Sequence, residues 1–491
     1  MWSQYNTPLF TALVEHAKKE STQFHIPGHK KGRGMDSEFR EFIGGNALSI
    51  DLINIEPLDD LHQPKGIIKQ AQDLAARAFG SDYTFFSVQG TSGVIMTMIM
   101  SVCGPGDKII VPRNVHKSIM TGIVLSGANP VFIHPEVDPN LGISHGITPK
   151  SVEMALKKYP DAKAVLVINP TYFGVSGDLR KIVEIVHSYD VPVLVDEAHG
   201  VHIHFHENLP VSAMQAGADM SATSVHKLGG SMTQSSILNV RGNLVSPKHV
   251  QSVLSMLTTT STSYLLLASL DTARKLLVTE GENLLENAIC LAEETRAQIN
   301  EIDHLQCVGR EIVGTDAVYA MDPTKLVISV KELGITGYQV EKWLREQFNI
   351  EIEMSDLYNI LCIITFGDTK QDVRKLVQAL KKLSEEFKNQ TFSDVETSVL
   401  LPDIPSLALT PRDALYAETE VVMFEESVGR IIAEFVMVYP PGIPIFIPGE
   451  IITEENLIYM RKNIEAGLPV QGAEDVELKL IRVIKEEQSI K

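Results

Sequence analysis

The sequence is poor in cysteine, and its few cysteines are scattered. Cys103, Cys290, Cys307 and Cys362 stand far apart in a chain of 491 residues and form no CxxC pair. This spacing argues against a disulfide framework and against a zinc site. Isolated thiols suit a reducing compartment, so we expect a cytoplasmic protein.

Basic residues are outnumbered as well. The chain has 43 Lys and Arg against 62 Asp and Glu, and its formal net charge at pH 7 is −19. A surface of that sign repels nucleic acid backbones and acidic lipids, so we expect neither nucleic acid nor membrane as a partner. A small cationic substrate would be attracted.

The sequence lacks a long uninterrupted hydrophobic run. Its most apolar late stretch, IIAEFVMVYPPGIPIFIPGE, contains Glu434 and four prolines before Gly449, which exclude a continuous membrane-spanning helix. The segment MWSQYNTPLF has neither the basic nor the apolar region of a secretion signal. We therefore expect neither a membrane span nor an export signal.

Short β-branched runs separated by helical patterns fill the region from about residue 80 to 245. The runs are KIIVPR, PVFIHP, AVLVINP and VPVLVDEAHG. This alternation predicts an α/β fold with a mainly parallel sheet, and ligands collect at the carboxyl ends of such strands.

The length of the chain predicts two or three domains. Helical patterns occupy residues 249 to 300, and LVISV, NIEIEM and LCIITF then predict strands of a smaller α/β unit. The polar stretch KNQTFSDVETS precedes a proline-punctuated segment and marks a boundary. We expect a large domain over 1–300, a small α/β domain over 301–390 and a C-terminal domain over 391–491.

Asp196 and Lys227 are the residues that point most directly to chemistry. Asp196 follows the buried-strand pattern VPVLV, and Lys227 lies in the later run SATSVHKLGG. A charge at the end of a buried strand is rarely left without a partner. Pyridoxal phosphate needs a lysine amine for its Schiff base and a carboxylate that keeps its ring nitrogen protonated. This pair favours that cofactor over the alternative of a helix-capping carboxylate and a solvent-facing lysine.

Two further motifs offer contacts for the cofactor. In QGTSG, Thr91 and Ser92 begin an apolar helix, where backbone N–H groups and hydroxyls make a phosphate cradle, although plain N-capping is the alternative. In SVHK, taken as extended, Ser224 and His226 share one face and could bind the same phosphate, with Lys227 on the other side.

Histidines add two hypotheses. In RNVHKS, His116 follows a strand, and its ring could stack on the cofactor unless it is a capping or packed histidine. The run HIHFH places His202, His204 and His206 on one face of an extended segment, which resembles a metal site. Neutral imidazoles lining a cofactor pocket or a subunit contact account for it, and we expect no metal.

With these motifs assembled, the sequence resembles the bacterial ornithine/lysine/arginine decarboxylases, a family of fold-type I pyridoxal phosphate enzymes. The resemblance runs through nearly the whole chain. Its motifs are FHIPGHKKG, INIEPLDDLHQPKG, QGTSG, RNVHKS, NPTYFG, DEAHG, SVHK, TTTSTSYLLLASLD and YPPGIPIFIPGE. Within the family, the chain is most similar to the biosynthetic arginine-decarboxylating branch.

The resemblance implies an aspartate aminotransferase-like large domain and assigns roles to the motif residues. Lys227 would carry the Schiff base, Asp196 would pair with the pyridinium and His116 would stack on the ring. The other cofactor contacts would be Thr91, Ser92, Ser224, His226 and Ala198. The proton donor would be Lys227 or His199, and the sequence leaves that choice open.

The implied reaction is decarboxylation of L-arginine to agmatine and carbon dioxide, which feeds polyamine synthesis. Lysine or ornithine decarboxylation is the nearest alternative, followed by transamination or aldol cleavage and by a non-catalytic cofactor-binding protein. A guanidinium would be gripped by carboxylates at the far end of the pocket. The candidates are Glu450, Asp356, Asp59 and Asp60.

The resemblance also implies a homodimer or a dimer of dimers with shared active sites. The TTTSTS run at 258–263 would reach the neighbouring subunit's cofactor phosphate. Large acid-stress members begin with an additional wing domain, whereas HIPGHK appears here by residue 25. We therefore do not expect the wing-dependent decamer.

Overall fold

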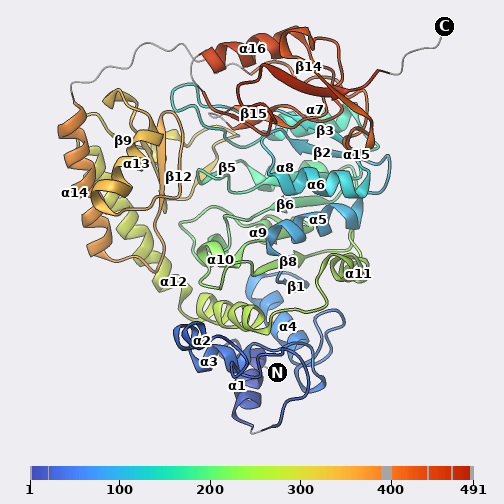
Figure 1. Cartoon of the computed structure of the whole chain (residues 1–491), viewed down its shortest axis with the longest axis vertical. Coiled ribbons are helices and arrows are strands. Elements are labelled where there is room, and N and C mark those ends of the chain that lie inside the picture. The colour runs from blue at the N-terminus through green and yellow to red at the C-terminus, as the bar shows by residue number, and fades with distance from the viewer. Residues whose placement is uncertain (1–2, 20, 389–400, 439–441, 466–467, 487–491) are drawn as a thin grey trace. The chain divides into compact units, whose positions relative to one another are not determined.

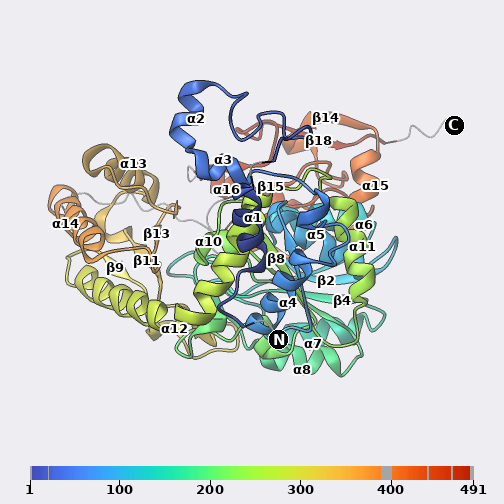
Figure 2. The ribbon, with the colours of Figure 1, turned by 90° about the horizontal axis from the view of Figure 1, so that it is seen from below.

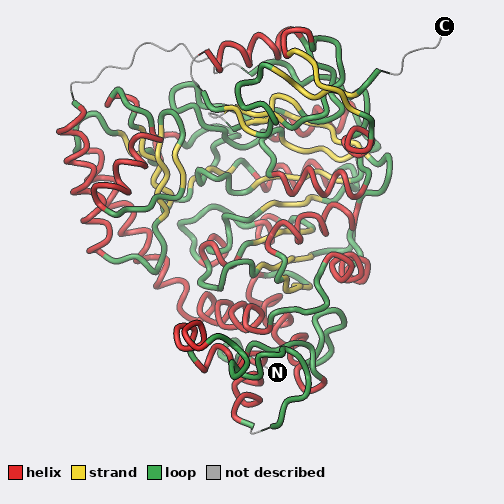
Figure 3. The backbone as a smooth tube through the Cα atoms, viewed as in Figure 1, coloured by secondary structure: helices red, strands yellow, loops and turns green. Residues whose placement is uncertain are grey.

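The computed structural model describes residues 3–19, 21–388, 401–438, 442–465 and 468–486, and it has an α/β architecture (Figure 1). The chain divides into two compact units. The first comprises residues 1–102 and 190–284, and the second comprises residues 103–189 and 285–491. Both units contain strands and helices (Figure 3).

Four strands of the first unit lie in the order β1-β8-β7-β6. β6 pairs with β7 in parallel, whereas β8 pairs antiparallel with both β7 and β1. Their bounds are Tyr83–Ser87 for β1, Val193–Asp196 for β6, Met220–Thr223 for β7 and Ser236–Val240 for β8. All residues of β6 are buried, which explains why this strand appears in the sequence as one apolar run.

The sequence predicts helices after QGTSG and at residues 249 to 300, and the structure has helices in both places. α5 follows β1 directly and contacts β1, β6, β7 and β8. The helices of the first unit are α1 Pro8–Lys18, α2 Ser37–Ile43, α3 Gly45–Ile50, η1 Glu56–Leu58, α4 Ile67–Phe79, α5 Gly90–Val102, η2 Ile203–Phe205, α9 Ala213–Ala216, α10 Val225–Leu228 and α11 Pro247–Leu257. A long helix, α12 (Tyr264–Asn300), begins in this unit and continues into the second.

The second unit contains three parallel strands in the order β4-β2-β3. Their bounds are Lys108–Pro112 for β2, Asn129–Ile133 for β3 and Ala164–Ile168 for β4, and the helices between them and after them are α6 Lys117–Ser126, α7 Pro149–Lys158 and α8 Leu179–His187. KIIVPR, PVFIHP and AVLVINP are therefore strands, as predicted. The predicted mainly parallel α/β arrangement is confirmed.

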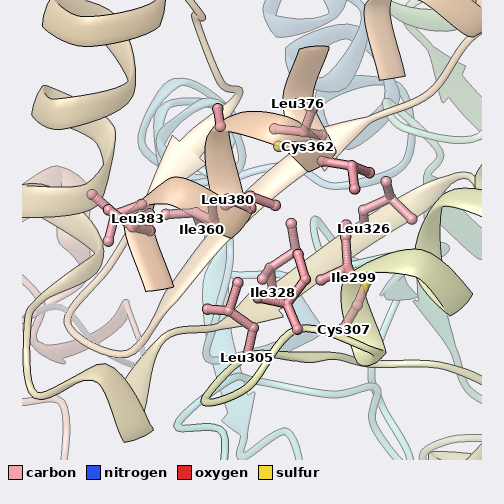
Figure 4. Packing of buried hydrophobic residues seen from close by; sticks show 14 of the residues in the cluster. Ile299, Leu305, Cys307, Leu326, Ile328, Ile360, Cys362, Leu376, Leu380 and Leu383 are labelled. Carbon is pink, nitrogen blue, oxygen red and sulfur yellow. The ribbon is translucent and has the colours of Figure 1, made fainter. Parts of the chain in front are cut away.

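An antiparallel sheet with the order β12-β13-β11-β9 forms the α/β unit predicted after residue 301. Its bounds are β9 Gln306–Cys307, β11 Lys325–Ser329, β12 Met354–Ser355 and β13 Asn359–Ile363, with α13 Gly337–Phe348 and α14 Lys370–Phe387 beside it (Figure 2). Apolar side chains from α12, the sheet and α14 interdigitate in its core (Figure 4). Short elements β5 Val175–Ser176, β10 Ala320–Met321, η3 Arg310–Ile312 and η4 Lys331–Leu333 complete this part.

One strand of this region was predicted wrongly. NIEIEM alternates as a strand should, but only its last residue, Met354, belongs to β12. Asn349 adopts a left-handed conformation with φ 50° and caps the C-terminus of α13. The residues directly after it lead away from the end of the helix and are not part of a strand.

The C-terminal part has small antiparallel sheets, and the hydrophobic core that they share includes Leu357 and Tyr358 from the preceding α/β region. β14 (Thr419–Met423) pairs with β18 (Leu480–Ile484), and β15 (Val436–Val438) lies between β16 (Ile443–Phe446) and β17 (Val470–Gln471). Its helices are α15 Pro411–Tyr416, η5 Phe424–Glu426 and α16 Glu454–Glu465. The predicted domain boundary at residue 390 lies outside the described residues, and the boundary at residue 300 remains a prediction. Within the described residues, no helix is long and apolar enough to cross a membrane.

Candidate functional site

Lys227 lies in a short helix and not in an extended segment. Ser224 is the N-cap of α10, so Val225, His226 and Lys227 are helical, and the prediction that SVHK alternates as a strand was wrong. Ser224 occupies the N-cap position without a capping hydrogen bond from its side chain, and its hydroxyl contacts the hydroxyl of Thr91 instead. The Nζ of Lys227 lies 2.9 Å from the Nε2 of His199. The sequence predicted both residues, and the structure brings their side chains together.

Asp196 is the last residue of β6, and its side chain is buried. Its Oδ1 accepts a hydrogen bond of 3.1 Å from the backbone N–H of Ala198. Burial raises the pKa of Asp196, while the Ala198 N–H and the positive charge of Lys227 lower it. A carboxylate in this position is stabilised by a cationic partner. The ring nitrogen of pyridoxal phosphate, once protonated, has the required charge.

The QGTSG motif joins β1 to the N-terminus of α5 (Figure 1). The hydroxyl of Thr91 contacts the hydroxyl of Ser224 and lies 2.8 Å from the hydroxyl of Ser236. Gly90 has φ +66°, and a Cβ placed there would meet no atom within 4 Å. Ser92 is exposed at the start of the helix. Hydroxyls and helix N–H groups beside open space are the donor set that a phosphate requires.

His226 is oriented by its own partner. Its Nδ1 donates to the carbonyl oxygen of Ser235 at 2.8 Å, which fixes the ring beside the start of β8. Ser235, just before β8, and Ser236, its first residue, were not predicted to contribute to this site. Neither serine carries a local signal that it will contact His226 or Thr91. Four of the predicted phosphate contacts, Thr91, Ser92, Ser224 and His226, belong to the first unit.

His116 caps a helix in the second unit. It is the N-cap of α6, where its Nδ1 accepts from the backbone N–H of Ser118 and lies 2.8 Å from the Ser118 hydroxyl. The alternative of a capping histidine is therefore what the structure describes. Stacking of its ring on the cofactor remains a prediction.

The histidines of HIHFH do not share one face of an extended segment. Residues 203–205 form the short helix η2, and His202 is also in a helical conformation, so the predicted alternation was wrong. The Nδ1 of His204 lies 2.8 Å from the hydroxyl of Ser212, the N-cap of α9. Among the residues that the structure describes, no group of three or more His, Cys, Asp or Glu side chains could hold a metal ion.

Asp59 and Asp60, two of the predicted substrate residues, accept hydrogen bonds from backbone N–H groups of the first unit. Both carboxylate oxygens of Asp59 accept backbone N–H groups, those of Lys65, Gly66 and Ile68 at 3.0, 2.7 and 3.0 Å. They therefore cap the start of α4. Asp60 accepts from the backbone N–H of His62 at 3.0 Å.

Asp356 and Glu450, the other two candidates, have internal partners in the second unit. Asp356 accepts the backbone N–H groups of Tyr358 and Asn359, both at 2.8 Å, and burial raises its pKa to about 6. The two oxygens of Glu450 accept from the Nη1 and Nη2 of Arg113 at 2.5 and 2.8 Å. A substrate guanidinium at Glu450 would have to replace Arg113, so this ion pair argues against Glu450 as a substrate residue.

Taken together, the first unit provides an amine, a buried carboxylate, an imidazole and a hydroxyl-lined helix start. The amine belongs to Lys227, the carboxylate to Asp196 and the imidazole to His199. These groups fit pyridoxal phosphate, since they match its aldehyde, its ring nitrogen and its phosphate.

Comparisons with known proteins support this assignment. Family models described as the Orn/Lys/Arg decarboxylase major domain and C-terminal domain match residues 7–372 and 394–468. The chain is 70% identical over 488 residues to arginine decarboxylases of Bacillus anthracis and Bacillus subtilis strain 168, across 99% of this chain and 99% and 100% of theirs.

A solved lysine decarboxylase of Francisella novicida has the same fold. It superposes with a TM-score of 0.85 at 23% identity, covering 98% of this chain and 81% of that chain. The predicted fold class, a fold-type I large domain with further domains, is confirmed. From its family models and its full-length relatives, this chain belongs to the Orn/Lys/Arg decarboxylase family.

Proposed function

We propose that the protein is a pyridoxal phosphate-dependent decarboxylase that converts L-arginine to agmatine and carbon dioxide, as a step toward polyamines. The observation that carries the substrate assignment is the 70% identity to arginine decarboxylases over essentially the whole chain. The observation that carries the chemistry is the grouping of Lys227, His199 and Asp196 in one unit.

Asp196 would hold the proton on the cofactor's ring nitrogen. Bound pyridoxal phosphate supplies an aldehyde that condenses with amines and a ring that accepts the electron pair left when carbon dioxide departs. A charged carboxylate beside the ring nitrogen favours the protonated ring. In return, the ring's positive charge would lower the pKa of Asp196, which burial raises.

Lys227 and His199 would handle the proton that replaces the departing carboxylate. Lys227 would hold the cofactor at rest, and its amine would be released when the substrate's amine takes its place. At 2.9 Å, Nζ and Nε2 can share a proton. His199 would therefore protonate the product carbon itself or keep Lys227 charged for that step.

The phosphate would lie at the N-terminus of α5. Thr91, Ser92 and Ser224 offer hydroxyls there, and His226 offers its remaining ring nitrogen. His116 would stack on the ring, and Ala198 would contact the cofactor. The buried or capping roles of Asp356, Asp59 and Asp60 leave the carboxylates that bind the guanidinium unassigned.

We further propose a cytoplasmic homodimer or dimer of dimers with shared sites, in which residues 258–263 reach the neighbour's phosphate. Neither nucleic acid nor membrane is proposed as a partner, in keeping with the net charge of −19. Sedimentation of the cofactor-loaded protein tests the assembly, because a stable and active monomer would contradict shared sites.

Amine production from separate substrates tests the proposed function. Purified, cofactor-loaded protein receives arginine, lysine or ornithine, and the products are separated by chromatography. We expect agmatine from arginine, and little cadaverine or putrescine from the other two. Cadaverine or putrescine as the main product would support decarboxylation but would assign lysine or ornithine as the substrate. No amine from any of the three would contradict decarboxylation.

A further inference from the structure

Glu197 is a buried carboxyl group to which the proposed chemistry assigns no role. It follows Asp196 directly, and only 3% of its surface is exposed. Its backbone N–H donates to the carbonyl oxygen of Ala222 at 3.0 Å, which extends the pairing of β6 with β7 by one residue. The backbone of Glu197 thus lies where β6 ends beside β7.

The side chain of Glu197 joins three elements of the first unit. Its Oε1 accepts the backbone N–H of Ala213, the first residue of α9, at 2.6 Å. Its Oε2 accepts from the hydroxyl of Thr223, the last residue of β7, at 3.4 Å. The Ser221 side chain also hydrogen-bonds to it. One carboxyl group therefore connects the end of β6, the end of β7 and the start of α9.

Both strand ends carry the residues of the candidate site. Asp196 precedes Glu197, and the carbonyl oxygen of Glu197 accepts from Gly200 at 2.9 Å, so Glu197 closes the turn that contains His199. On the other side, Thr223 leads into Ser224 and Lys227. A change in the separation of these two ends would change the separation of Asp196 and Lys227.

We propose that Glu197 is a positioning residue, whose hydrogen bond with Thr223 holds the β6 end with Asp196 and His199 at the correct distance from the β7 end that leads to Lys227. The bond from the Ala213 N–H fixes the same carboxyl group to α9. This inference rests on the proposed function and adds to it a residue that does not touch the cofactor. Catalytic groups must be held within a fraction of an ångström of their productive positions. A buried group that bonds to both segments is well placed to hold them.

Glu197 acts in this role through its hydrogen bonds and not through a charge. Burial raises its pKa to about 8, and the neighbouring negative charge of Asp196 also raises it, so the group is largely neutral at pH 7. A glutamine has the same shape. Its carbonyl can accept from Ala213, and its amide can donate to the Thr223 hydroxyl oxygen.

The test compares Glu197→Gln, Glu197→Ala and Thr223→Val with the wild type and with Glu207→Ala, a control at an exposed nearby carboxylate. The first readout is the rate at which pyridoxal phosphate becomes covalently attached to Lys227 in the apoprotein, followed by absorbance. The second is kcat and KM for arginine. Thermal unfolding of each variant shows whether it is folded.

We expect Glu197→Ala to slow attachment and to lower kcat on the order of 10- to 100-fold, with KM little changed. Thr223→Val should show a smaller loss of the same kind, whereas Glu197→Gln and Glu207→Ala should resemble the wild type. If Glu197→Ala does not fold, the test rests on the other two variants. Slower attachment and a lower kcat in Thr223→Val, with wild-type values in Glu197→Gln, would support the proposal, and wild-type values in Thr223→Val would overturn it. A folded Glu197→Ala with wild-type attachment and kcat would overturn the proposal, as would a glutamine variant as impaired as the alanine variant.

The attachment rate keeps this inference separate from the proposed function. A wild-type protein that attaches the cofactor but produces no agmatine from arginine would contradict the substrate assignment. The comparison of attachment rates among the variants would still test the role of Glu197.

Discussion

Arg113 and Glu450 form a buried two-pronged ion pair within the second unit, although 337 positions separate them in the chain. Nη1 and Nη2 of Arg113 donate to the two oxygens of Glu450, and the Arg113 Nε donates to the carbonyl oxygen of Pro444 at 2.8 Å. The guanidinium also stacks on the ring of Phe132, 4.8 Å from its centre. The late PGE motif therefore holds the loop that follows β2.

Glu450→Ala should destabilise the second unit by about 3–5 kcal/mol, because it leaves the Arg113 charge buried without its partner. Denaturant unfolding followed by hydrogen exchange in residues 103–189 measures this loss. Replacing both members, as in Arg113→Met with Glu450→Met, should cost less than Glu450→Ala alone. A loss that is no smaller in the double variant would argue against the ion pair as the cause.

The same pair predicts that Glu450 does not select the substrate. Glu450→Gln keeps an acceptor for Arg113, so the ratio of kcat/KM for arginine to that for lysine should remain close to the wild-type ratio. A shift of that ratio toward lysine would return Glu450 to the guanidinium-binding residues.

Asp196→Asn should impair turnover far more than cofactor attachment. The amide matches the carboxylate in shape but cannot stabilise a protonated ring nitrogen, so kcat should fall by orders of magnitude while the cofactor's absorbance band still forms. Asp190→Asn, at an exposed aspartate in the same unit, is the matched control. Near-normal turnover by Asp196→Asn would contradict the role of Asp196.

His199→Asn should lower kcat and change its pH dependence, because the amide cannot exchange a proton with Lys227 at neutral pH. Attachment of the cofactor should persist, since Lys227 itself is retained. His249→Asn changes an exposed histidine and should leave the pH profile unaltered. An unaltered profile in His199→Asn would leave Lys227 as the group that acts alone.

Asp356 should make stability depend on pH in a defined window. Its pKa in the folded protein is raised from 3.8 to about 6 by burial. The folded state therefore binds the proton more tightly than the unfolded state does. Its contribution to stability is fully present below about pH 4 and is lost as the pH rises through 6.

Asp356→Asn removes this titration while it keeps an acceptor for Tyr358 and Asn359. The difference in melting temperature between Asp356→Asn and the wild type should therefore move in favour of the variant between about pH 4 and 7. A difference that is constant over this range would mean that Asp356 titrates equally in both states.

The strands and the cofactor-binding residues could be predicted where a short run of the sequence contains the whole signal. VPVLV and AVLVI are strands because both faces of a parallel sheet are buried, which produces apolar runs. The identities of Asp196 and Lys227 follow from what pyridoxal phosphate requires. Each of these signals lies within a short run of the sequence, such as VPVLV before Asp196 or SVHK at Lys227.

The remainder depends on partners that the sequence does not reveal. Glu450 was predicted to bind the substrate because it lies in the late PGE motif. Its partner in the structure is Arg113, which is 337 positions away and could not be recognised from the sequence. SVHK begins α10 and is not the predicted strand, and the hydroxyl of Ser224 at its N-cap position contacts Thr91, 133 positions away. Glu197 attracted no prediction, because its contacts with Ala213 and Thr223 appear only when α9 and β7 are in place.

The most direct test of the account is the carbon balance of the reaction. Carboxyl-labelled arginine is supplied to the cofactor-loaded protein, and labelled carbon dioxide and agmatine are measured together, with Lys227→Ala as the control. We predict equal amounts of the two products and the loss of both in Lys227→Ala. A keto acid that retains the label, or undiminished agmatine from Lys227→Ala, would contradict decarboxylation at this site.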